Sequence, residues 1–177
     1  MKAGATIVFV DESAFRLLPS VVRTWARKGQ TPTLATPCKY EHLSVAGALT
    51  LSGRVLTKVQ EKAFTGEDSV DFLKHILREV PGQVIVIWDG ARIHHGEAVK
   101  VFLSSGGAKR LRLIRLPAYA PELNPSEGLW CWLKRELGNV CCPALDGLKD
   151  ELLLAVNRLR RRQDVLMGCF KRAGLQI

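Results

Sequence analysis

Two short and almost wholly apolar segments, each followed at once by an acid, constrain the fold of this 177-residue chain most strongly. The first is TIVFV (6–10), which leads into Asp11 and Glu12, and the second is VIVIW (84–88), which leads into Asp89. Continuous apolar runs of this length are typical of strands that are covered on both faces of a sheet. The sequence therefore predicts two buried strands with carboxylates at their C-terminal ends.

The pattern around these segments indicates an α/β domain. The remaining strands are expected at 23–26, 43–51, 54–59 and 111–116, with a hairpin turn at Gly53. Amphipathic helices are expected at 68–80, 97–103 and 148–161, the first capped by Asp68 or Ser69. Strands at the start of the chain, followed by alternating strands and helices, predict a mixed central β-sheet flanked by helices.

Composition narrows the class of partner. The chain has 26 Lys and Arg against 17 Asp and Glu, a net charge of +9, which favours a polyanion such as nucleic acid. No apolar run approaches the roughly 18 to 20 residues that a membrane span needs.

The cysteines are predicted to be packing or surface thiols in a reduced cytosol. Their number is odd, they lack C-x-x-C spacing, and no signal peptide is recognised. These cysteines are Cys38, Cys131, Cys141, Cys142 and Cys169.

A third acid lies in the segment LPAYAPELNPSEGLW (116–130). Asn124 is a good N-cap, Pro125 suits the first helical position, and Glu127 falls three residues after the cap, as in a capping box. By itself Glu127 therefore has a structural explanation. Glu127 nevertheless follows a predicted strand, as Asp11 and Asp89 do, and three carboxylates at one sheet edge would suit Mg²⁺ or Mn²⁺. Strand-edge acids are common, so both interpretations stay open on this pattern alone.

Four segments, in order and spacing, resemble the catalytic domain of DDE transposases, and in particular the bacterial insertion-sequence branch of the mariner superfamily. They are VFVDESAFRLLP, TWARKGQTP, VIVIWDGARIHH and LPAYAPELNPSEGLW. The resemblance implies a ribonuclease H-like fold over 1–177, as a single DDE catalytic domain without the N-terminal helix-turn-helix region of full-length relatives. It also implies that Asp11, Asp89 and Glu127 are catalytic and hold two Mg²⁺ or Mn²⁺ ions.

The resemblance further implies a function. The chain is expected to cleave DNA strands and transfer them in cut-and-paste transposition, at TA targets, acting as a homodimer on double-stranded DNA in the bacterial cytoplasm near the nucleoid. Two alternatives stay open: a ribonuclease H-like nuclease that only hydrolyses, and a non-catalytic remnant that binds DNA or dimerises.

Other residues have weaker predicted roles. Glu12 should point to the strand face opposite to that of Asp11. His94 and His95 are expected in a loop after Asp89. The residues expected to support the metal ligands are Glu12, His94, His95 and Asn124. Trp130 is expected to pack in the core beneath the site. Gly90 stands where relatives often carry Asn, so a contact beside the second acid is expected to be missing.

DNA contacts are predicted in two regions. The first holds Arg23, Trp25, Arg27 and Lys28, and the second holds Arg158, Arg160 and Arg161. The alternative for Trp25 is packing on a hairpin. For the arginine run it is a solvated helix face that compensates the helix dipole.

Overall fold

The computed structural model describes residues 4–35 and 39–176. In these residues one mixed sheet has the strand order β3-β2-β1-β4-β5. Its strands are β1 (Thr6–Arg16), β2 (His42–Thr50), β3 (Val55–Gln60), β4 (Val84–Trp88) and β5 (Leu111–Arg115). Strand β1 is antiparallel to β2 and parallel to β4, which is parallel to β5. The predicted mixed sheet and the hairpin at Gly53, whose φ is +78°, are confirmed.

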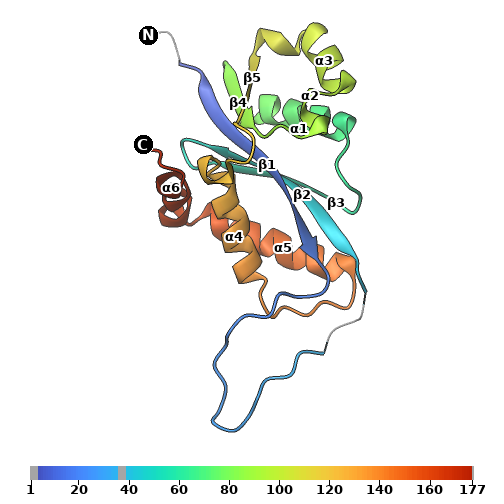
Figure 1. The fold of residues 1–177 in the computed structure, drawn as a ribbon, viewed down its shortest axis with the longest axis vertical. Coiled ribbons are helices and arrows are strands. Elements are labelled where there is room, and N and C mark those ends of the chain that lie inside the picture. The colour runs from blue at the N-terminus through green and yellow to red at the C-terminus, as the bar shows by residue number, and fades with distance from the viewer. Residues whose placement is uncertain (1–3, 36–38, 177) are drawn as a thin grey trace.

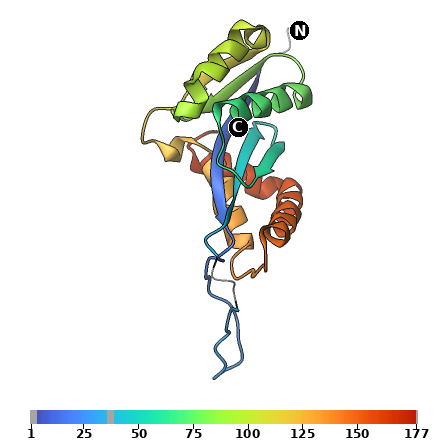
Figure 2. The ribbon, with the colours of Figure 1, turned by 90° about the vertical axis from the view of Figure 1, so that its right-hand side faces the viewer.

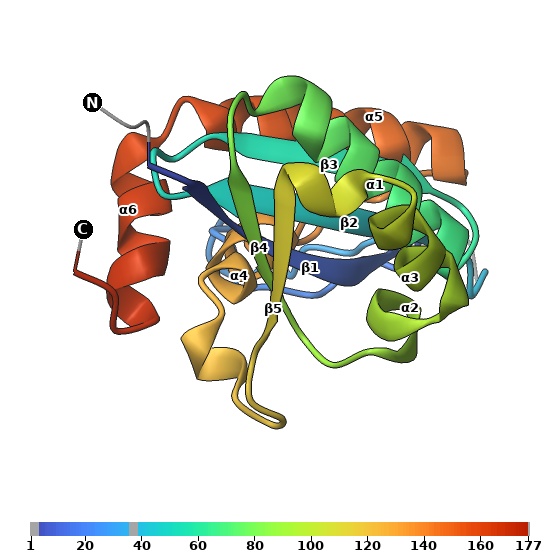
Figure 3. The ribbon, with the colours of Figure 1, turned by 90° about the horizontal axis from the view of Figure 1, so that it is seen from above.

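Helices cover both faces of the sheet (Figures 1 and 3). They are α1 (Gly66–Glu79), α2 (Arg92–His95), α3 (Glu97–Ser104), α4 (Ser126–Glu136), α5 (Leu145–Arg160) and α6 (Gln163–Arg172). Val8 and Val10 of β1 pack with α1 and α3, whereas Phe9 and Phe15 pack with α4, α5 and α6. The period-2 alternation of β1 therefore supplies both cores. Helix α6 was not predicted.

Strand β1 is longer than predicted. It continues through Asp11 to Arg16, because β2 pairs with it over the whole stretch from Val8 to Arg16. Its parallel pairing with β4 ends earlier, at Phe9 and Ile87. Asp11 therefore lies in the middle of a strand, at the level where the neighbouring parallel strand has just ended.

Between β1 and β2, residues 17–35 project from the body as a long arm, seen at the bottom of Figures 1 and 2. The predicted strand at 23–26 is wrong: these residues are exposed and neither helical nor extended in a sheet. Among residues 4–35 and 39–176, no strand pairs with this stretch. At the base of the arm, the side chain of Asn139 accepts from the N–H of Val22 (2.9 Å) and donates to its carbonyl (2.8 Å).

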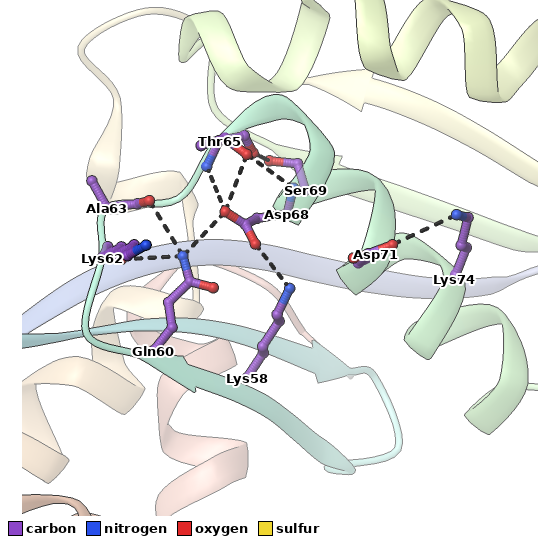
Figure 4. A network of polar contacts seen from close by, with 9 residues as sticks. All are labelled: Lys58, Gln60, Lys62, Ala63, Thr65, Asp68, Ser69, Asp71 and Lys74. Carbon is purple, nitrogen blue, oxygen red and sulfur yellow. Dashed lines mark hydrogen bonds and ion pairs between the residues drawn. The ribbon is translucent and has the colours of Figure 1, made fainter.

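Helix α1 begins two residues before the predicted start. Thr65 is its N-cap, and Asp68 completes a capping box by accepting the backbone N–H of Thr65 at 3.1 Å. The carboxylate of Asp68 also accepts from Lys58 and Gln60, as Figure 4 shows. Burial acts to raise the pKa of Asp68, but the hydrogen bonds from Gln60, Thr65 and Lys58 outweigh it and lower this pKa to about 2. The prediction that Asp68 or Ser69 is the N-cap is therefore wrong, because Thr65 has that position.

The remaining expectations concern thiols and membranes. Four cysteines lie in the described part and all are free: Cys131 and Cys141 are exposed, and Cys142 and Cys169 are buried. This agrees with the predicted packing and surface roles, whereas Cys38 lies outside the described residues. Within residues 4–35 and 39–176, the helices lack the combined length and apolar character that crossing a membrane requires.

Candidate active site

Asp11 is a buried carboxylate on the α4 side of the sheet, with 9% of its surface exposed. The indole Nε1–H of Trp130 in α4 donates to its Oδ2 at 2.8 Å. The pKa of Asp11 is raised to about 7, mainly by burial and also by the negative charges of Glu127 and Glu12, while the hydrogen bond from Trp130 acts to lower it. The site therefore contains a carboxylate that a bound cation would help to ionise.

A glycine in β2 makes room for the Trp130 ring. Gly47 pairs with Asp11 across the strands, and a Cβ at position 47 would lie 2.5 Å from Cη2 of Trp130. The ring also packs edge-on against Phe15, with centroids 6.2 Å apart. Trp130 is thus part of the core, as predicted, and its hydrogen bond to Asp11 is an addition that the sequence did not reveal.

Asp89 follows β4 directly, and its carboxylate is about half exposed. Its Oδ1 lies 2.7 Å from Nδ1 of His94 and accepts the N–H of Ala91 at 2.9 Å. His94 lies in the short helix α2, not in the predicted loop, and its ring stacks on Trp88 at 4.2 Å with an interplanar angle of 5°. Asp89 is therefore held in place by the backbone turn after β4 and by a buried imidazole.

His94 joins two acids. Its Nε2 lies 3.0 Å from Oε1 of Glu12, while its Nδ1 faces Asp89. Burial acts to lower the pKa of His94, but the hydrogen bond to Glu12 and the charges of Glu12 and Asp89 outweigh it and raise this pKa above its ordinary value. A protonated imidazole can donate from both nitrogens, which suits this position between two carboxylates. Glu12 faces the α2 side, opposite to Asp11, as predicted.

Glu127 lies in the first turn of α4 and is exposed. The Oδ1 of Asn124 accepts the N–H of Ser126 at 3.1 Å, and the buried Ser126 Oγ contacts the carbonyl of Phe9 in β1 at 3.4 Å. The predicted capping box does not form, because the N–H of Asn124 donates instead to the carbonyl of Pro121. The carboxylate of Glu127 is thus not used as a cap, and Ser126 fixes the start of α4 against β1.

The three acids line one pocket of about 400 Å³, shared with Arg115, Tyr119 and Asn124. Tyr119 is fully exposed at the tip of the loop before α4, with a φ of +58° that is rare outside glycine. In the described residues no three His, Cys, Asp or Glu side chains already stand in a metal-binding arrangement. The donor set nevertheless fits Mg²⁺ or Mn²⁺, because it offers hard carboxylate oxygens whose mutual repulsion a cation would relieve.

Arg115 was not predicted as a site residue. It ends β5 beside Trp88, and a Cβ at Gly90 would overlap its guanidinium group. The space beside Asp89 that a side chain at position 90 would need is therefore filled from β5. The only sequence signal for Arg115 was its place at the end of a strand that alternates basic and apolar residues.

The other candidate residues lie outside this pocket. His95 is exposed in α2. The four candidate residues of the arm are all exposed: Arg23, Trp25, Arg27 and Lys28. The side chain of Trp25 is 98% exposed, so it is not packed on a hairpin. Arg160 donates to the carbonyl of Val55, at the start of β3, and Arg158 lies 3.6 Å from Glu136. Arg161 is exposed at the end of α5. Contact of these residues with DNA stays a prediction.

Comparisons with known proteins agree with this fold. The chain is similar to the mariner Mos1 transposase in a paired-end complex with Mg, with a TM-score of 0.70 and 18% identity over 96% of this chain and 53% of that chain. It is also similar to Mos1 in the strand transfer complex, with a TM-score of 0.62 and 18% identity over 97% of this chain and 55% of that chain. For the catalytic domain of Mos1, the TM-score is 0.57 and the identity is 14% over 97% of this chain and 83% of that chain. No curated protein matches the sequence.

These likenesses confirm the predicted ribonuclease H-like fold, and the chain spans about half the length of the transposase chains in the two complexes. A family model described as DDE superfamily endonuclease matches residues 6–148, which is most of the sequence. That matched region includes Asp11, Asp89 and Glu127. The chain therefore belongs to the DDE superfamily endonuclease family.

Proposed function

We propose that this chain is the catalytic domain of a transposase of the bacterial insertion-sequence branch of the mariner superfamily, which cleaves DNA strands and joins them to a target. The observation that carries the proposal is that Asp11, Asp89 and Glu127 line one pocket although they come from three distant segments. The family match and the fold of the Mos1 catalytic domain support the same conclusion.

Asp11, Asp89 and Glu127 would hold two Mg²⁺ or Mn²⁺ ions, and two relatives are described as complexes with Mg and with Mn. When bound, such ions activate the attacking oxygen and stabilise the leaving oxygen of a phosphodiester. The protein orients the ligands. Trp130 holds one oxygen of Asp11, His94 holds one oxygen of Asp89, and Ser126 anchors the helix that carries Glu127.

The same site would serve both chemical steps. Cleavage uses water as the nucleophile and leaves a 3′-hydroxyl, and strand transfer uses that 3′-hydroxyl on a phosphodiester of the target. Both are in-line displacements at phosphorus, so one set of ligands suffices and no residue of the chain needs to form a covalent bond with DNA. Double-stranded DNA ends as the partner belong to the same proposal, supported by the paired-end complexes of structural relatives. A homodimer and TA targets are part of the proposal through the resemblance to the mariner superfamily.

The first test is nicking of supercoiled plasmid with Mg²⁺ or Mn²⁺, alongside isothermal titration of the metal. We expect the wild type to bind metal and nick, and Asp89→Asn and Glu127→Gln to lose nicking. Glu122→Gln is the matched control, because Glu122 is an exposed acid five residues from Glu127 that does not line the pocket. Loss of activity in all variants alike, or nicking that persists in Asp89→Asn and Glu127→Gln, would contradict the assignment of the ligands.

Strand transfer separates the alternatives. A labelled duplex with a free 3′-hydroxyl is incubated with supercoiled target, and covalent joining of label to plasmid is measured. Joined product supports the transposase, whereas nicking without joining favours a nuclease that only hydrolyses. A wild type that binds DNA but neither binds metal nor nicks would favour a non-catalytic remnant.

A further inference from the structure

Among the described residues that line the pocket of the three acids, Arg115 is the one with a positively charged side chain. It comes from the end of β5, where it pairs with Trp88, the residue before Asp89. Its position is set by the sheet and not by a loop, because the parallel register between β4 and β5 fixes the two strand ends side by side.

The guanidinium group lies directly over Gly90. A Cβ at position 90 would overlap Nη2, Nε and Cζ of Arg115, so this glycine is what allows the group to lie against the backbone beside Asp89. Among the described residues, Arg115 makes no side-chain hydrogen bond and no ion pair within 4 Å of a carboxylate, although it shares its pocket with three acids. Its donors are therefore free for a ligand.

A ligand that enters this pocket meets an electrostatic problem. A DNA phosphate is an anion, and Asp11, Asp89 and Glu127 repel it. A fixed cation next to the acids offsets part of this repulsion, and arginine is suited to the task because its planar fork can donate two parallel hydrogen bonds to phosphate oxygens.

We propose that Arg115 binds a phosphate of the DNA strand that occupies the pocket, by donating to its non-bridging oxygens. The inference rests on the proposed function, since it takes DNA as the substrate. It adds Arg115 as a phosphate-binding residue, whose guanidinium group has room in the pocket because position 90 is a glycine. Arg115 is a substrate-binding residue here and takes no part in proton transfer.

The test measures binding of a fluorescent DNA duplex by anisotropy in EDTA, at several salt concentrations. We expect Arg115→Ala to weaken binding by about tenfold to a hundredfold, as for loss of a charge-assisted contact, and to reduce the slope of log K against log salt by about 1. Arg115→Lys should keep the slope and recover part of the affinity, because lysine retains the charge but not the fork. Arg112→Ala is the matched control: an exposed arginine of the same strand, outside the pocket.

Gly90→Ala provides a second readout that a merely structural role of Arg115 would not give. The added Cβ displaces the guanidinium, so Gly90→Ala should weaken DNA binding in the wild-type background and have no further effect when combined with Arg115→Ala. Circular dichroism checks that each variant is folded. Additive effects of the two substitutions, or equal affinity and slope for Arg115→Ala and Arg112→Ala, would overturn the proposal.

The two proposals can fail separately. If the wild type nicks DNA and Arg115→Ala binds DNA as the wild type does, Arg115 has no role and the catalytic assignment stands. If the wild type neither binds nor nicks DNA, the proposed function itself is wrong, and the inference about Arg115 falls with it.

Discussion

Replacement of Asp11 by asparagine is expected to stabilise the metal-free protein at neutral pH while it removes a candidate metal ligand. The pKa of Asp11 is raised from 3.8 to about 7, mainly by burial. Below pH 3.8 both the folded and the unfolded protein carry a protonated Asp11, so this residue has no net effect. As the pH rises towards 7 the unfolded state ionises first, and the free energy of unfolding falls.

The size of the effect follows from the two pKa values. One unit of pKa corresponds to about 1.4 kcal/mol, so the ionised Asp11 destabilises the fold by about 4 kcal/mol above pH 7. Asparagine keeps an acceptor for the Trp130 N–H but buries an NH₂ group, which costs about 1 to 2 kcal/mol. We therefore expect Asp11→Asn to be more stable than the wild type by about 2 to 3 kcal/mol at pH 8.

Urea unfolding in EDTA, followed by tryptophan fluorescence at pH 4 and at pH 8, measures this difference. The gain should vanish or reverse at pH 4. Saturating Mg²⁺ should stabilise the wild type but not Asp11→Asn. Equal stabilities at pH 8, or a difference that does not change with pH, would refute the view that burial of an ionised Asp11 destabilises the metal-free fold.

Three other predictions concern the hydrogen bond to Asp11, the packing of Trp130 and the cap of α1. Trp130→Phe removes the N–H that holds Asp11 and should weaken Mn²⁺ binding by about tenfold or more, as measured by titration calorimetry; unchanged affinity would mean that the hydrogen bond does not orient the ligand. Gly47→Ala places a Cβ 2.5 Å from Cη2 of Trp130 and should lower the free energy of unfolding by about 1 to 3 kcal/mol in thermal denaturation, and an unchanged Tm would contradict the close packing. Asp68→Asn breaks the capping box and should cost about 1 kcal/mol at pH 7; because the pKa of Asp68 is lowered to about 2, this cost should shrink as the pH falls from 4 towards 2, and a cost that is constant with pH would argue against the lowered pKa.

Local patterns in the sequence were sufficient for several elements. The apolar run 84–88 forms β4, the spacing of Leu148, Leu152 and Leu159 marks the buried face of α5, and Gly53 turns the hairpin. These features depend on residues close together in the chain. The prediction of a strand at 23–26 was wrong because a strand also depends on residues far away in the chain. A segment with β-forming residues becomes a strand only if a partner strand lies beside it.

The sequence by itself determined the strand that precedes Asp89 and the helix that begins near Glu127, because strand periodicity and proline placement are local properties. The choice of Asp11, Asp89 and Glu127 as metal ligands came from the resemblance to DDE transposases, and it stays a prediction. Only the tertiary structure decided their surroundings. The hydrogen bond from Trp130 to Asp11 joins residues 119 positions apart. The contact from His94 to Glu12 joins α2 to β1, and the position of Arg115 over Gly90 joins the end of β5 to the loop after β4. Such contacts depend on the register of β1, β4 and β5 and on the docking of α4, which no local pattern encodes.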